Sequence, residues 1–330
     1  MRYYKLKIGN ITYEANKNNR TPLNIEFDIK AYSQGMASIP GFITIYNNSI
    51  DNFTKSRELI GEDIELRAGI ENNLYTQRLG YTNVKDDLLM KGKIANILGD
   101  YSNITPRMYF YFSIIEFKKK VNSNKEEQFR ECIIKIPQNT IIIDSLIKGI
   151  KFFTNWNVKS SVLAKTILNN SKTDIIITAT SIENLITQFK EMFSIDINID
   201  TLTQTIELYK INEKELPKGL IVIQPNDLLQ QPEILSIALD ISCVTRLRGD
   251  LRLNSLIMLY GTIPSSSSFS QSLLTLTKQG KAMNVLRLGV YRIIDLQHKG
   301  SFYNISPEGW CTSFRAIPYT QTNSTSKIFS

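Results

Sequence analysis

Alternating apolar and polar residues dominate the first part of the chain. In LNIEFDIK the apolar residues share one face, namely Leu23, Ile25, Phe27 and Ile29. A two-residue period of this kind is typical of a half-buried β-strand. Further strand patterns, separated by Gly, Asn, Asp and Pro, occur in MRYYKLKIGNITYEA, GFITIYN, DIELRAGI, LLMKGKIANIL and RMYFYFSIIEF. Short strands at these intervals predict a small N-terminal β-barrel domain over residues 1–136.

The hydrophobic period changes in residues 137–212. A helical spacing of apolar residues follows a capping-box pattern of Thr180 and Glu183, and is formed by Ile182, Leu185, Ile186, Phe189, Met192 and Phe193. Two shorter helical patterns precede it, around residues 143–150 and 162–167. Alternation then returns in two stretches, with Ile195, Ile197 and Ile199 in the first and Ile206 and Leu208 in the second. We therefore expect an α/β module that contains helices and a hairpin.

Strand patterns resume near residue 217, in GLIVIQP, LSIALDISCVT, LRLNSLIMLYG, VLRLGVYRIIDLQHKG and GWCTSFRAI. They predict a second β-barrel domain over residues 213–318, followed by a polar tail at 319–330. The predicted fold class is mainly β with an α/β insertion, in which two small β-barrel domains flank a helix-plus-hairpin module.

One Ser-rich stretch, at residues 263–284, interrupts the strands of the second domain. A long irregular stretch inside a compact domain is often functional, so it is a candidate interface; a hairpin tip without a partner is the alternative. Its candidate interface residues are Ser265, Ser266, Ser267, Ser268 and Phe269.

Composition favours a folded globular protein. Hydrophobic residues make up 42% and charged residues 21% of the 330-residue chain. We expect no membrane insertion, because no apolar run approaches the roughly 20 residues that span a bilayer, and the sequence begins without a signal-peptide core. Cys132, Cys243 and Cys311 are too few and too widely spaced for a disulfide framework or a zinc site, so buried thiols are predicted.

The net charge of +8 raises the question of nucleic-acid binding. Lys118, Lys119 and Lys120 form the one tight basic run, in a polar stretch that also contains Glu126 and Glu127. This pattern is typical of a solvated loop, and no nucleic-acid-binding motif accompanies it. The run is therefore a candidate interface segment.

The sequence offers little for catalysis. His298 is the single histidine, which excludes a multi-histidine metal site, and a structural role at its strand end is favoured over catalysis. No GxSxG elbow, Walker loop or dinucleotide fingerprint occurs, so neither an enzymatic activity nor a cofactor is expected. The Arg248, Gly249, Asp250 tripeptide is interpreted as a hairpin turn, where Gly-Asp is expected for backbone reasons.

Four segments, taken in order, resemble the Mu-like baseplate hub family of contractile phage tails. The first holds PLNIEFDIK, FITIYNNSIDN, DIELRAGI and LLMKGKIANI, the second is SIENLITQFKEMFSIDINIDTLTQTIELYK, and the third is NDLLQQPEILSIALDISCVTRLRGDLRLNSLIML. The fourth, YRIIDLQHKGSFYNISPEGWCTSFRAI, is the most specific. Its signature residues are His298, Gly300, Gly309 and Trp310, to which Pro232 of the third segment is added. The sequence departs from the family at Leu228 or Leu229, where members often have Gly, and in the Ser-rich stretch.

The resemblance implies a structural subunit of a virion tail tip that is assembled in the host cytoplasm. Family members share their architecture with the hub part of type VI secretion spike proteins. The implied assembly is a homotrimer whose six barrels form a ring, matching a sixfold tail tube on one side and a threefold spike on the other. Its implied partners are the spike protein and tail tube or tube-initiator proteins, with tape-measure protein and DNA passing through the channel. The alternatives are a tail-tip cell-wall hydrolase and a secretion-system spike hub component.

Overall fold

The computed structural model describes most of the chain in two units. The described residues are 2–15, 22–32, 41–47, 57–71, 87–102, 104–113, 132–154, 156–160, 171–180, 182–193, 195–200, 204–210, 220–235, 240–259, 265–266 and 290–319. Unit 1 combines Met1–Ile114 with Leu216–Ser330, and unit 2 is Ile115–Glu215.

Unit 1 is built around a 14-stranded sheet. Its N-terminal strands are β1 (Arg2–Ile8), β2 (Ile11–Ala15), β3 (Ile25–Tyr32), β4 (Gly41–Tyr46), β5 (Asp63–Ile70), β6 (Leu88–Asp100) and β7 (Arg107–Ser113), with the 3-10 helix η1 (Arg57–Leu59). Its C-terminal strands are β13 (Leu220–Ile223), β14 (Glu233–Ile234), β15 (Ile241–Arg246), β16 (Leu256–Leu259), β17 (Ser265–Ser266), β18 (Val290–Ser301) and β19 (Trp310–Pro318), with η2 (Pro225–Asp227) and η3 (Pro307–Gly309). The main strand order is β17-β14-β15-β19-β18-β3-β4-β7-β6-β5-β1-β2, and β16 pairs with both β13 and β18.

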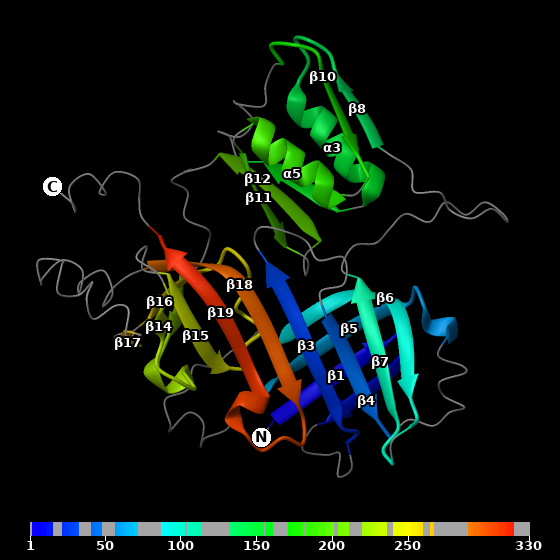
Figure 1. The fold of residues 1–330 in the computed structure, drawn as a ribbon, viewed down its shortest axis with the longest axis vertical. Coiled ribbons are helices and arrows are strands. Elements are labelled where there is room, and N and C mark those ends of the chain that lie inside the picture. Colours follow the sequence, from blue (N-terminus) through cyan, green and yellow to red (C-terminus); the bar gives the residue numbers. More distant parts are fainter. Residues whose placement is uncertain are drawn as a thin grey trace, which may run out of the picture. The chain divides into compact units, whose positions relative to one another are not determined.

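The β3–β18 ladder joins the two ends of the sequence in this sheet (Figure 1). It is antiparallel and runs from the pair Tyr32 and Asp295 to the pair Glu26 and Ser301. Inward residues of the N-terminal strands form one hydrophobic core together with Leu247 and Trp310 from the C-terminal half, and inward residues of the C-terminal strands form another. Each core is lined by the alternating apolar positions that the sequence pattern identified, because successive strand residues point to opposite faces.

Unit 1 contains the same four-strand arrangement twice. In sequence order β4, β5, β6 and β7 lie in the sheet as β4-β7-β6-β5, and β15, β16, β18 and β19 lie as β15-β19-β18-β16, with every pair antiparallel. β3 pairs with the first strand of one set, and β14 pairs with the first strand of the other. We call these sets the first and second strand repeats.

In the described part of unit 2, two helices pack against small sheets. Its elements are β8 (Cys132–Ile136), α3 (Ile142–Phe153), β9 (Asn157–Ser160), β10 (Ile175–Ala179), α5 (Ile182–Phe193), β11 (Ile195–Asp200) and β12 (Thr205–Lys210). β8 pairs with β10, and β11, β12 and β9 form a three-stranded sheet. Apolar residues of the helices, among them Leu146, Ile150, Leu185 and Phe189, are fully buried.

The mainly β fold with an α/β insertion is confirmed. The helices over residues 143–150 and 182–193 and the antiparallel β11–β12 hairpin are also confirmed. The helix pattern at residues 162–167 lies outside the described residues. β8, which falls before the predicted boundary at residue 136, pairs with β10 inside unit 2. The closure of each strand set into a barrel, like the exact domain limits, stays a prediction.

Candidate functional site

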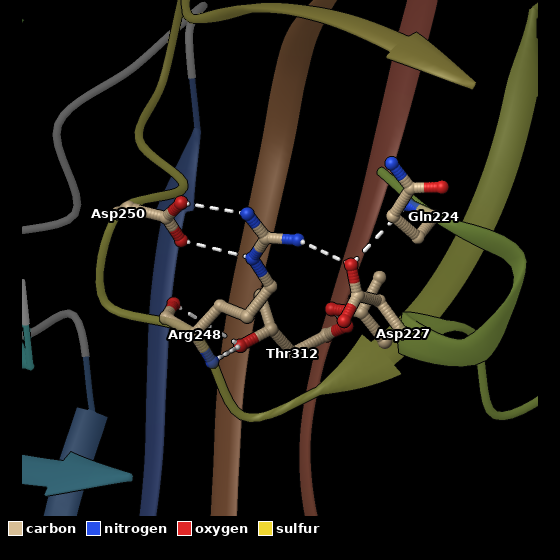
Figure 2. A network of polar contacts seen from close by, with 6 residues as sticks. Gln224, Asp227, Arg248, Asp250 and Thr312 are labelled. Carbon is tan, nitrogen blue, oxygen red and sulfur yellow. Dashed lines mark hydrogen bonds and ion pairs between the residues drawn. The ribbon is translucent and has the colours of Figure 1, made fainter. Parts of the chain in front are cut away.

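A buried arginine, Arg248, lies at the centre of a cluster of polar side chains in unit 1, which we call the polar cluster. Its other members are Asp227, Asp250, His298 and Thr312. Arg248 lies two residues after the end of β15, and its side chain is 3% exposed. Its guanidinium donates two hydrogen bonds to Asp250, from Nε to Oδ1 at 3.0 Å and from Nη2 to Oδ2 at 2.7 Å. A third, from Nη1, reaches Oδ2 of Asp227 at 3.1 Å (Figure 2). The two parallel hydrogen bonds to Asp250 make that contact bidentate, which is a strong form of arginine–carboxylate contact.

Asp227 is positioned by the short helix η2. The backbone N–H of Gln224 donates to Asp227 Oδ2 at 3.2 Å, and the N–H of Asp227 donates to the Gln224 carbonyl at 3.0 Å. The next residue, Leu228, has φ −79°, which suits any residue type, so the turn forms with leucine where the resembled family often has glycine. Leu228 bridges to Thr245, which holds η2 against β15.

Thr312 links the arginine to the single histidine. Its Oγ1 accepts the backbone N–H of Arg248 at 3.0 Å and lies 2.9 Å from Nδ1 of His298. The direction of the proton in the second contact depends on the imidazole tautomer. Thr245 donates its hydroxyl to the Thr312 carbonyl at 3.2 Å, so β15, β18 and β19 are tied together by side chains as well as by their ladders.

Burial controls the protonation of His298. The side chain is enclosed by protein, and this desolvation lowers its pKa to about 4, although the nearby Asp250 carboxylate acts in the opposite direction. The imidazole is therefore neutral at pH 7. Because His298 and Arg248 are shielded and already bonded to protein groups, their contacts position the backbone segments around them.

The remaining signature residues shape the β18–β19 hairpin. Trp310 is buried, donates its Nε1–H to the Gly69 carbonyl at 3.0 Å, and packs edge-on against Phe27. Gly300 lies opposite Trp310 in the ladder. A Cβ atom on Gly309 would lie 2.8 Å from the Asn304 side chain, so glycine is required there for space.

Three of the other candidate residues, Pro232, Ser265 and Ser266, are brought together where β14 pairs with β17. Pro232 is buried directly before β14. Ser265 and Ser266 form β17, which pairs in parallel with β14. The remaining interface candidates lie outside the described residues, namely Ser267, Ser268, Phe269, Lys118, Lys119 and Lys120.

The interpretation of Arg248, Gly249 and Asp250 as a hairpin turn is wrong. β15 before this segment pairs with β14 and β19, whereas β16 after it pairs with β13 and β18. The segment is a connection whose arginine turns inward toward a carboxylate 21 residues earlier in the chain. Local turn chemistry could not identify that partner.

Chemistry beyond this cluster is sparse in the part of the chain that the structure describes. No group of three or more His, Cys, Asp or Glu side chains there could hold a metal ion. Cys132, Cys243 and Cys311 are free and buried, as predicted, and burial raises the pKa of each thiol. None of the described helices is both long and apolar enough to cross a bilayer.

In fold, nearly the whole chain is similar to solved phage tail proteins. The 43 kDa tail protein of prophage MuSo2 from Shewanella oneidensis matches with a TM-score of 0.51 and 8% identity, over 96% of this chain and 97% of that one. A tail protein from Neisseria meningitidis MC58 matches with a TM-score of 0.50 and 7% identity, over 96% of each chain. The chain has a phage tail hub-like fold. The fold implied by the sequence resemblance is thereby confirmed.

A secretion protein shares this fold. It is an Escherichia coli component of the type VI secretion system, described as structurally similar to the T4 tail proteins gp27 and gp5. It matches with a TM-score of 0.50 and 12% identity, over 96% of this chain and 77% of that one. No protein-family model and no curated protein matches the sequence.

Proposed function

We propose that this chain is a non-catalytic structural subunit of a bacteriophage tail, which assembles as a homotrimeric ring between a sixfold tail tube and a threefold spike. The observation that carries the proposal is the end-to-end fold match, which covers 96% of this chain and 97% of a prophage tail protein. A match of that extent leaves little room for a separate catalytic domain among the matched residues.

The two strand repeats support the symmetry-matching role. A trimer of a chain that holds the same four-strand arrangement twice presents six similar units. Three copies can therefore contact six tube subunits equivalently, while each copy as a whole contacts one of three spike subunits. A channel enclosed by such a ring would pass tape-measure protein and DNA, and the virion tail tip is the place such a ring would occupy after assembly in the host cytoplasm.

The contact between subunits can be inferred from the β3–β18 ladder, which joins the two strand repeats inside one chain. β18 pairs with β19 on one edge, and its residues Asp295–Ser301 pair with β3 on the other. The equivalent strand of the first repeat, β6, pairs with β7 along Lys93–Asp100, and no described strand pairs with its other edge beyond Ile94, whose backbone is hydrogen-bonded to Gly61 and Glu62. Leu98 on this stretch is 48% exposed. Open edges and exposed apolar residues are normally covered in an assembly.

The mass of the purified chain tests the proposal. Light scattering should give about three times 37.7 kDa, either alone or after co-expression with the spike protein of the same phage. Leu98→Lys should weaken the trimer, because it places a charge in the subunit contact, whereas Met192→Lys on α5, at a residue 51% exposed in unit 2, is the matched control. A monomer that ignores the spike and clears peptidoglycan would replace the proposal with a tail-tip cell-wall hydrolase.

The Escherichia coli match favours a second candidate function, that of a spike hub component of a secretion system. The two differ in partner. A trimer that binds phage tube subunits supports the tail role, and a trimer that binds only secretion-system tube subunits supports the second candidate.

A further inference from the structure

The hairpin turns of the two strand repeats share a sequence. Residues 99–106 are GDYSNITP and residues 300–307 are GSFYNISP, which agree without a gap at Gly, Asn, Ile and Pro and are similar at the aromatic and hydroxyl positions. Asn, Ser, Thr and Pro are ordinary turn residues. Isoleucine is different, because its β-branched side chain favours a packed strand position.

The strand order places the two turns at equivalent positions. The first connects β6 to β7 and the second connects β18 to β19, which are the third and fourth strands of their repeats. From β18 through β3, β4 and β7 to β6, every neighbouring pair is antiparallel, so β18 and β6 run in the same direction. Both turns therefore lie at the same end of the sheet (Figure 1).

Both turns present their isoleucine to solvent. Ile104 is 105% exposed and Ile305 is 93% exposed, the two highest values among the large hydrophobic residues of the described chain. A single exposed apolar residue needs no explanation. Two that occupy the same position of a repeated sequence, at the same end of one sheet, point to a shared contact.

The second turn is held in place by hydrogen bonds to the residues on either side of Ile305, while the Ile305 side chain stays exposed. The Arg2 guanidinium donates to the carbonyls of Ser301, Asn304 and Ser306 and lies over the Trp310 ring, 5.7 Å from its centroid. Tyr303 donates its hydroxyl to the Pro22 carbonyl at 2.7 Å. The Asn304 side chain accepts the Ser306 N–H at 2.9 Å. A turn fixed in this way loses little conformational entropy on binding.

We propose that Ile104 and Ile305 are the anchors of one docking epitope, which each chain presents twice to the tail tube, a ring of six identical subunits. The inference rests on the proposed trimer, in which two tips in each of three chains make six. In a sixfold ring the distance between two neighbouring positions equals the distance of each position from the central axis. The two turns lie four strand spacings apart along the sheet, which is at most about 20 Å in a straight line, so the six tips would lie no more than about 20 Å from the axis.

Two features favour the sixfold partner over the threefold spike. A spike with three equivalent sites would engage one turn of each chain and leave no use for a second, equivalent copy of the epitope. The strands that lead into the two turns, β6 and β18, also run in the same sense, as equivalent parts of neighbouring ring positions must.

The experiment compares Ile104→Ser, Ile305→Ser and the double variant, with Ile176→Ser as the control. Ile176 lies on β10 in unit 2 and is 66% exposed. The mass of each variant alone reports the trimer, and binding to the purified tail-tube protein of the same phage is measured separately. We expect unchanged trimers, a loss of tube affinity of about tenfold or more for each single variant, a larger loss for the double variant, and no loss for the control.

Three results would overturn the inference. Full tube binding by the double variant would show that the turns do not dock there. A loss confined to one single variant would show that the two turns are not equivalent. A loss of the trimer itself would make them contacts between copies of this chain. If the unmodified chain forms no trimer, it is instead the proposed function that fails.

Discussion

Gly300 of β18 lies directly opposite Phe27 of β3, and the Phe27 ring fills the space where a side chain at position 300 would project. A Cβ atom on Gly300 would lie 2.2 Å from two carbons of that ring. Phe27 is itself buried against Trp310 and has little room to move. The absence of a side chain at Gly300 thus permits the junction between the two strand repeats.

Gly300→Ala should therefore destabilise unit 1 by about 1–3 kcal/mol, the usual cost of overpacking a core. Adding Phe27→Leu, which shortens the opposing side chain, should recover part of the loss. Denaturation can be followed by fluorescence, because the chain has two tryptophans and Trp156→Phe leaves Trp310 as the reporter of unit 1. Strictly additive effects of the two substitutions would show that the ring and the glycine do not constrain each other.

Arg248→Met should be more damaging than Asp227→Asn. Removing the guanidinium takes an ion-pair partner away from the buried Asp227 and from the partly buried Asp250, and breaking a buried pair in this way costs about 3–5 kcal/mol. Asparagine at position 227 can still accept the Gln224 N–H and leaves the bidentate contact with Asp250 intact. Urea denaturation of both variants gives the comparison, and an equal or reversed order would mean that the ion network contributes little to stability.

Most strands were predictable because their signal is local. The alternation in residues 23–30 depends on one face being buried, and β3 forms there as expected. The partner of β3 is not local, since β18 lies more than 260 residues away in the sequence. No periodicity carries that information, so the continuous sheet and the junction at Gly300 emerge only in the structure.

The polar cluster was missed for a related reason. His298, whose place at a strand end favours a structural role, is buried and bonded to Thr312. At the equivalent place in the first repeat, Ile97 pairs with Phe110, which are both apolar. The cluster is thus a polar replacement of a hydrophobic pair, and it requires the buried Arg248 that local sequence assigned to a turn.

Acid should destabilise unit 1 through His298. Its pKa is about 4 in the folded protein and near 6.5 when unfolded, so the unfolded chain binds more protons between these values. This contribution is fully present above pH 6.5 and is lost as the pH falls toward 4, by about 2 kcal/mol at pH 5. His298→Gln should remove that part of the pH dependence. If the variant loses as much stability as the original chain between pH 7.5 and pH 5, other groups account for the loss.

Arg2→Ala should loosen the 301–310 turn while unit 1 stays folded. Arg2 donates to three carbonyls of that turn and covers the Trp310 ring, so its loss removes the contacts that fix the turn's backbone. The amides of Asn304 and Gly309, which donate to the carbonyls of Ser301 and Ser306, should then exchange with deuterium at least about tenfold faster.

The matched control for this substitution is Arg67→Ala. Arg67 pairs with Glu65 and Asp87 in the same unit and makes none of the described contacts to the turn. Its removal should leave exchange at Asn304 and Gly309 unchanged. If Ile305 docks as proposed, Arg2→Ala should also weaken tube binding with the Ile305 side chain intact, because the epitope would have to be ordered on binding. Faster exchange with unchanged tube binding would show that docking through Ile305 does not depend on an ordered turn.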